Sequence, residues 1–185
     1  MNTPSMALRF LEDLRNCLKK WPTRQHFDIA NSDIRPIYDA MLNFFEDDEW
    51  PLIKEEKSPI LYTTFQGDNG RWLCRAEAHD QDQQLVFYSL YGQAVPQEQQ
   101  EAIALFITRA NYGLMVGNFE LDLDSGELRY KTSMDLEGSE LTNALMSAIA
   151  YNNVLTMDQY LPGIVAVMER SLPPQTAIQQ VENLD

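Results

Sequence analysis

The sequence predicts an α+β domain in which helices pack against one five-stranded antiparallel sheet. Strands are predicted over residues 60–66, 71–79, 85–91, 119–124 and 127–134, and in the second, fourth and fifth of these segments apolar and polar residues alternate with the period of a strand. Apolar residues recur at helical spacing over residues 5–20, 33–46, 96–113 and 139–170. Short turns join neighbouring strands, which favours antiparallel pairing. The predicted order of elements is α-α-βββ-α-ββ-α.

Composition shifts along the chain predict four parts. Residues 1–21 form an N-terminal amphipathic helix, and residues 22–32 form a linker with few apolar side chains. Residues 33–172 form the α+β domain, whose last helical stretch is either one kinked helix or two. Pro173-Pro174 ends that stretch, so we expect residues 173–185 to be a flexible tail.

Two predicted hairpins fix much of the sheet. Asn69-Gly70 predicts a type I′ turn, because both central residues of that turn need a positive φ. The strand that begins at Phe119 is acidic on its polar face. The strand that follows it carries Arg129 and Lys131, so we expect cross-strand ion pairs.

The strand over residues 85–91 is apolar on both faces, so both faces must be covered. One face carries Leu85, Phe87 and Tyr91, and the other carries Val86, Tyr88 and Leu90. The helices of the chain, a second subunit or a client peptide could each cover the second set.

Charge and composition limit the kinds of partner. The chain of 185 residues has a formal net charge of −14, which disfavours nucleic acid as a ligand. Residues 1–24 hold five basic and two acidic side chains, so they carry +3 and the remaining 161 residues carry −17. No apolar run is long enough for a transmembrane segment. With no secretory leader and two distant cysteines, we expect a cytoplasmic protein.

Reactive groups are sparse in the sequence. His26 and His79 lack the clustered ligands of a metal site, so we expect no metal and no cofactor. No nucleophile has an identifiable base, so we expect no catalytic residues. The acidic run over residues 46–49 is either a solvated helix end or a docking point for a basic peptide.

The N-terminal amphipathic helix has three open interpretations. Its apolar stripe contains Phe10, Leu14 and Leu18, and basic side chains lie on its polar side. The stripe could pack back onto its own domain, which we favour because Glu12 and Asp13 dilute the basic side. It could instead enter a partner's groove, or make peripheral contact with an anionic membrane.

The sequence contains five distinctive short motifs, which are Gln66-Gly67-x-Asn69-Gly70-x-Trp72, Phe87-Tyr88-Ser89, Arg109-Ala110-Asn111-Tyr112-Gly113, Gly117-Asn118-Phe119-Glu120 and Arg129-Tyr130-Lys131-Thr132. These motifs resemble those of the YbjN family of bacterial sensory transduction regulators. The resemblance covers about residues 33–170. It implies a fold similar to that of type III secretion chaperones, which bind extended partner segments and usually form homodimers. It implies no catalytic residues.

These observations predict a non-enzymatic protein-binding module, similar to a chaperone, adaptor or regulator. We expect it to form a homodimer and to bind a protein or peptide through apolar sheet and helix surfaces. The candidate partner-binding residues are Trp72, Val86, Tyr88, Leu90 and Tyr112. The alternative is a small-molecule sensor domain, with a ligand pocket between the sheet and the helices.

Overall fold

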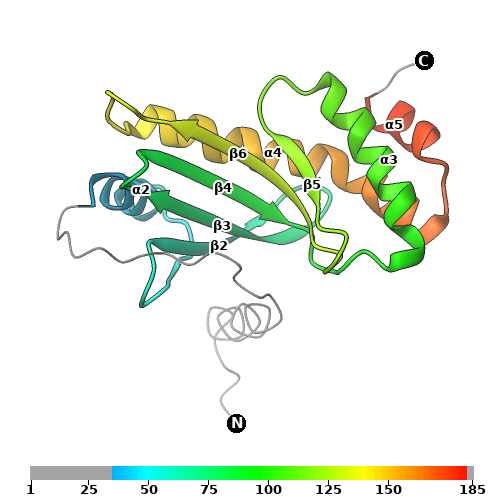
Figure 1. The fold of residues 1–185 in the computed structure, drawn as a ribbon, viewed down its shortest axis with the longest axis horizontal. Coiled ribbons are helices and arrows are strands. Elements are labelled where there is room, and N and C mark those ends of the chain that lie inside the picture. Colours follow the sequence, from blue (N-terminus) through cyan, green and yellow to red (C-terminus); the bar gives the residue numbers. More distant parts are fainter. Residues whose placement is uncertain (1–34, 183–185) are drawn as a thin grey trace, which may run out of the picture. The chain divides into compact units, whose positions relative to one another are not determined.

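A computed structural model describes residues 35–182 of the chain. The predicted N-terminal amphipathic helix and the whole of the predicted linker lie outside the described residues. The described elements are α2 (Pro36–Asp47), β1 (Ile53–Lys54), β2 (Ile60–Gln66), β3 (Arg71–His79), β4 (Gln84–Leu90), α3 (Gln97–Gly113), β5 (Asn118–Leu121), β6 (Leu128–Asp135), α4 (Asn143–Arg170) and α5 (Pro174–Glu182). The predicted α+β class is therefore confirmed (Figure 1).

The sheet has six antiparallel strands in the order β1-β2-β3-β4-β6-β5, one more than predicted. The additional strand is β1, which has only two residues and pairs Ile53 with Tyr62. Two residues are too few to form a strand pattern that can be recognised in the sequence. The helix α3 lies between β4 and β5 in the sequence. In the sheet, β6 lies between these two strands and pairs with both.

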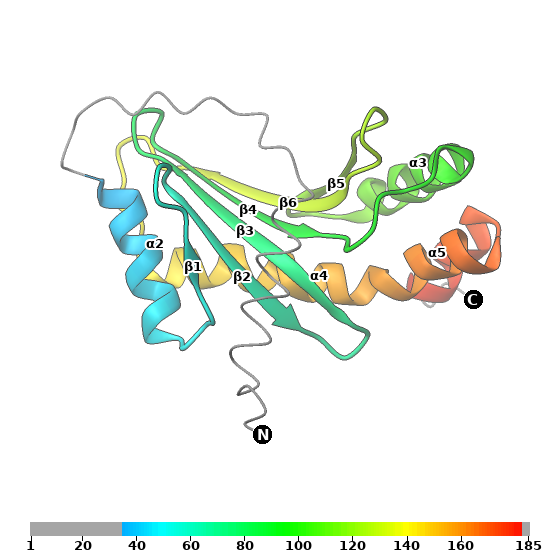
Figure 2. The same cartoon turned by 90° about the horizontal axis from the view of Figure 1, so that it is seen from below.

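One face of the sheet, which we call the first face, packs against α2 and α4. Figure 2 shows α4 running along one side of the strands. Met41 and Phe45 of α2, Phe87 of β4 and Met157 of α4 have no solvent exposure there. Burial of each such side chain contributes roughly 1.5–3 kcal/mol to folding, so this layer holds the domain together.

The opposite face, which we call the second face, alternates with the first along every strand. Strand register places on it Ile60, Tyr62, Leu73, Arg75, Glu77, Val86, Tyr88, Leu90, Arg129 and Lys131. The hydrophobic core that includes α2 and α4 contains none of these side chains. None of the helices in residues 35–182 therefore covers the second face as α2 and α4 cover the first.

Residues 143–170 form a single helix with Pro162 inside it, which answers the question that the sequence left open. Proline has no N–H, so the carbonyl of Asp158 loses its usual helical donor. The side chain of Asn69 donates to that carbonyl instead, at 3.1 Å. The carboxylate of Asp158 in turn accepts the backbone N–H groups of Asp68 and Asn69, at 3.0 and 2.9 Å. The β2–β3 turn thus fastens onto α4 where the proline interrupts its hydrogen bonds.

The observed β2–β3 turn differs from the type I′ turn that the sequence predicted. The hairpin is present, but neither Asn69 nor Gly70 has a positive φ. A Cβ at Gly67 would lie 2.2 Å from the Asp158 carboxylate, and one at Gly70 would lie 2.6 Å from the Leu161 side chain. The glycines are needed because the turn approaches the helix closely.

The structure also differs from the predicted flexible tail. Residues 174–182 form α5, which packs on α3 and α4. Pro174 occupies the start of this helix, where its missing N–H costs nothing. Ala177 and Ile178 are buried, Val181 packs against the same core, and Glu182 accepts from the Tyr160 hydroxyl at 2.7 Å. Within residues 35–182, no helix combines the length and the apolar character needed to cross a membrane.

Candidate protein-binding surfaces

Helix α3 from Leu105 onward and the loop after it expose a group of large apolar side chains, which we call the tip patch. Its inner neighbours Ile103 and Phe106 are fully buried. The tip patch comprises Leu105 (51% exposed), Tyr112 (95%), Met115 (98%) and Val116 (48%). In Figure 1 the loop that carries Met115 and Val116 stands away from the sheet between α3 and β5. Large apolar side chains exposed near one another in the chain, as Tyr112, Met115 and Val116 are, are typical of protein-interaction sites.

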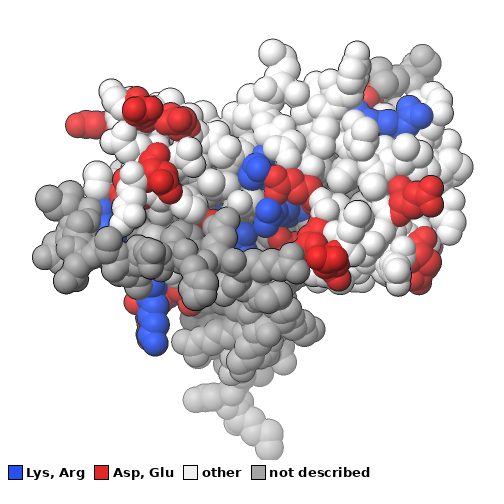
Figure 3. Space-filling view, in the orientation of Figure 1, with Lys and Arg blue, Asp and Glu red and all other residues white. Residues whose placement is uncertain are grey.

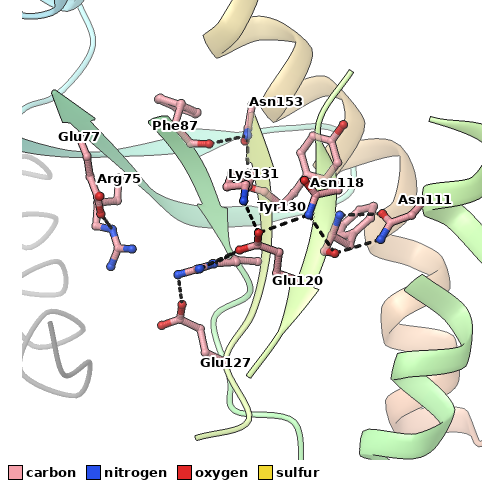
Figure 4. Close-up of polar contacts among 12 residues, drawn as sticks. Arg75, Glu77, Phe87, Asn111, Asn118, Glu120, Glu127, Tyr130, Lys131 and Asn153 are labelled. Atoms are coloured by element: carbon pink, nitrogen blue, oxygen red, sulfur yellow. Dashed lines mark hydrogen bonds and ion pairs between the residues drawn. The ribbon is translucent and has the colours of Figure 1, made fainter. Parts of the chain in front are cut away.

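The loop of the tip patch is fixed at its base. The side-chain amide of Asn111 donates to the carbonyl of Phe119 at 3.0 Å, and the Phe119 N–H donates to the Asn111 side-chain oxygen at 2.7 Å (Figure 4). The Asn111 carboxamide thus hydrogen-bonds to both backbone groups of Phe119, as a neighbouring strand would. This contact protects the edge of β5 from pairing with a strand of another chain. The Tyr130 hydroxyl donates to the carbonyl of Val116.

Gly117 completes this support. It has a φ of +76°, and a Cβ there would lie 2.5 Å from the carbonyl of Lys131. Glycine is the residue that tolerates both conditions. The tip patch therefore projects from a rigid base, which lowers the entropic cost of binding a partner.

The second face is organised around Tyr88. The guanidinium groups of Arg75 and Arg129 lie over its ring, at 4.7 and 4.5 Å from the ring centre. Burial raises the pKa of the Tyr88 phenol, so the ring stays neutral at physiological pH. Figure 3 shows basic and acidic side chains meeting near the middle of this face.

Ion pairs join β6 to β5, as predicted from the opposite charges on the two strands. Glu120 of β5 accepts from Arg129 at 2.7 Å and also pairs with Lys131. Arg129 also pairs with Glu127 at 3.0 Å. Burial acts to raise the pKa of Glu120, but the hydrogen bonds from Lys131 and Arg129 outweigh it and lower that pKa below its ordinary value.

The structure separates the sequence-predicted binding residues into three places. Val86, Tyr88 and Leu90 share the second face. Trp72 lies in the core of the first face, and its indole N–H donates to the Ser89 hydroxyl at 2.8 Å. Tyr112 belongs to the tip patch. Their roles in partner binding remain predictions.

Sequence reasoning missed the companions of Tyr112. Leu105 lies seven residues before Tyr112, two helical turns away on α3. Met115 and Val116 stand between two glycines, Gly113 and Gly117. Two apolar residues in a glycine-bounded loop are a signal that could have identified the tip patch.

Reactive chemistry is limited in the part of the chain that the structure describes. Burial raises the pKa of the Cys74 thiol to about 12, which leaves it protonated and inert. Residues 35–182 contain no group of three or more His, Cys, Asp or Glu side chains arranged to hold a metal. In the acidic run, Asp48 is held by the Trp50 indole at 2.8 Å and the Tyr151 hydroxyl at 2.6 Å. Asp48 thus ties the end of α2 to α4.

Comparison with known proteins gives one family and several structures. The model of the YbjN family, described as "Putative bacterial sensory transduction regulator", matches residues 38–165. The solved structure of YbjN from E. coli, titled "a putative transcription regulator", is 12% identical with a TM-score of 0.54. The match covers 69% of this chain and 89% of that chain. At this identity the likeness shows the fold alone. No curated protein matches the chain.

Two further structures are similar at lower scores. A chain of the HopA1-SchA chaperone-effector complex has a TM-score of 0.44 and 17% identity, covering 68% of this chain and 94% of that one. A chain of the ExoT-SpcS complex from Pseudomonas aeruginosa has a TM-score of 0.44 and 18% identity, covering 68% of this chain and 98% of that one. At these scores the likenesses carry no argument about function.

Proposed function

The chain belongs to the YbjN family, and from this premise we propose that it is a non-enzymatic protein-binding module that holds a partner polypeptide at the tip patch. The family is described as one of regulators, and a regulator acts through the molecules that it contacts. The observation that carries the proposal is the exposure of Tyr112 and Met115 together, at 95% and 98%.

The chemistry of the tip patch suits a polypeptide partner. Tyrosine offers a large contact area at a low cost in side-chain entropy. Methionine is flexible and polarizable, so it adapts to partners of different shape. The rigid base provided by Asn111 and Gly117 supports this proposal, because it positions both side chains before a partner arrives.

The alternative of a small-molecule sensor has less support. It requires a pocket between the sheet and the helices. Met41, Phe45, Phe87 and Met157 fill that layer with no solvent exposure. A ligand there would have to displace closely packed side chains.

A site-specific photo-crosslinker tests the proposal in cells. We expect a crosslinker at Met115 to capture one defined protein, and one at Leu155 to capture none. Leu155 is the matched control because it is an exposed apolar residue on α4, outside the tip patch. Equal capture at both positions would contradict the proposal. Capture of a second copy of this chain would assign the tip patch to the expected homodimer instead.

A further inference from the structure

The β2–β3 turn contains the only Asn-Gly pair of the sequence, at Asn69 and Gly70, and Asn69 is exposed to solvent. The backbone nitrogen that follows an asparagine can attack the side-chain carbonyl carbon. Glycine permits this attack most readily, because it has no Cβ to hinder the approach. A Cβ at Gly70 would lie 2.6 Å from the Leu161 side chain, so the packing of the turn on α4 favours glycine at this position. The fold thus keeps beside Asn69 the residue that makes it reactive.

We propose that Asn69 is a site of spontaneous deamidation, and that the attachment of the turn to α4 sets the rate of the reaction. In the first step the Gly70 nitrogen forms a bond to Cγ of Asn69. The bond from Cγ to the side-chain nitrogen breaks, and ammonia leaves with the proton of the Gly70 nitrogen. Water then opens the succinimide ring on either side and gives aspartate or isoaspartate. The reaction consumes water, releases ammonia and needs no oxidant or cofactor.

Three hydrogen bonds hold the turn in one conformation against α4. The backbone N–H groups of Asp68 and Asn69 donate to the Asp158 carboxylate at 3.0 and 2.9 Å. The Asn69 side-chain amide donates to the Asp158 carbonyl at 3.1 Å. Closing the five-membered ring requires a side-chain torsion away from the staggered rotamers. The turn must therefore open before the ring can form, and the rate of deamidation should follow the population of the open turn.

The product cannot restore this attachment. Aspartate and isoaspartate both carry a carboxylate in place of the N–H donor of Asn69, so the Asp158 carbonyl loses its partner. Pro162 cannot replace that donor, because proline has no N–H. The new negative charge also lies beside the Asp158 carboxylate, which is only 9% exposed, and like charges repel. Deamidation should therefore release the turn from α4.

Peptide mapping by mass spectrometry tests the site of reaction. After incubation of the full-length chain at mildly alkaline pH, we expect conversion of the amide to an acid at Asn69. Asn143 and Asn152 are also exposed but do not precede glycine, so both should remain intact.

Two variants test the control of the rate. Asp158→Ala removes the acceptor of two N–H groups of the turn, and we expect Asn69 to react roughly ten times faster in this variant. Glu101→Ala removes an exposed acidic side chain from α3 and should leave the rate unchanged. Thermal unfolding verifies that each variant is folded. If Asp158→Ala does not fold, Asp158→Asn, which keeps one side-chain acceptor, replaces it.

The consequence of the reaction is tested with Asn69→Asp, which reproduces one product directly. We expect this variant to unfold at a temperature roughly 3–8 °C lower than the natural protein. Hydrogen exchange at the backbone N–H groups of positions 68 and 69 should also be faster. Asn69→Ser removes the donor without adding a charge and cannot deamidate, so its unfolding temperature should lie between those of the other two proteins.

Each part of the proposal can fail separately. Reaction at Asn69 no faster than at Asn143 and Asn152 would overturn the assignment of the site. An equal rate in Asp158→Ala and in the natural protein would contradict control by the attachment. An unchanged unfolding temperature in Asn69→Asp would contradict the release of the turn. None of these measurements involves the tip patch, so their outcome is independent of the proposed function.

Discussion

Asn153 and Met115 mark two regions of the molecule with opposite properties. Asn153 of α4 is fully buried, and its amide donates to the carbonyls of Phe87 and Tyr130 and to the Thr132 hydroxyl, at 3.0, 3.2 and 3.1 Å. Met115 is 98% exposed. A polar amide group is enclosed and hydrogen-bonded in the first region, whereas apolar groups are left in water in the second. The difference indicates that the first face provides stability and that the tip patch is available for binding.

Replacement of Asn153 should have the largest effect on stability. Asn153→Ala removes three hydrogen bonds inside the core and leaves a small cavity, so we expect a loss of about 2–4 kcal/mol in the free energy of unfolding. Urea denaturation followed by fluorescence measures it. Asn152→Ala is the matched control, because the neighbouring Asn152 is exposed and bonds only the carbonyl of Ala148. A similar loss in both variants would contradict the contrast between the two regions.

Loss of the Asp158 carboxylate should have the second-largest effect on stability. Asp158→Ala leaves two backbone N–H groups of the β2–β3 turn without their acceptor, and we expect a cost of about 1–3 kcal/mol. Asp158→Asn keeps one side-chain acceptor and should fall between Asp158→Ala and the natural protein. Denaturant titration of the three proteins would contradict this account if Asp158→Asn and Asp158→Ala were equally unstable.

Removal of the Asn111 side chain should have a smaller and more local effect. Asn111→Ala exposes the edge of β5, and we expect a loss of about 1 kcal/mol together with faster hydrogen exchange at the Phe119 N–H. Asn118→Ala is a suitable control, since the Asn118 side chain makes only 3.4 Å contacts. Unchanged exchange at Phe119 would show that Asn111 does not protect the edge.

The ion pairs of Glu120 should make stability depend weakly on pH. Its folded-state pKa is lowered, so its contribution is present above the ordinary value of about 4.5 and is lost as pH falls through the folded-state value. Glu120→Gln should therefore lose less stability than the natural protein between about pH 7 and about pH 3. If urea denaturation showed that both proteins lose the same amount of stability as pH falls, the assigned role of Glu120 would be contradicted.

The sequence predicted the elements that follow local rules. Residues 60–66 and 71–79 were predicted as strands with the bounds of β2 and β3, and the cross-strand charges at Glu120 were predicted from the alternation over residues 119–134. It could not predict features set by distant contacts. The reason for Gly70 lies in Leu161 of α4, and the reason for Asn69 lies in the proline that leaves the Asp158 carbonyl without a donor.

The candidate sites show the same limit. Sequence reasoning placed Val86, Tyr88 and Leu90 together, because strand alternation alone puts them on one face. It grouped Trp72 with them by residue type, although register puts Trp72 on the first face. Sequence reasoning did not identify Met115 and Val116, because an irregular loop has no period from which the exposure of a side chain can be predicted.

The smallest effect on stability should come from the tip patch, and this provides the most direct test. We expect the double variant Tyr112→Ser/Met115→Ser to unfold within about 0.5 kcal/mol of the natural protein, because neither side chain is buried. We expect the same variant to lose co-purification of the protein that a crosslinker at Met115 captures. Retention of that protein, or its loss only in step with reduced stability, would contradict the assignment of the tip patch to partner binding.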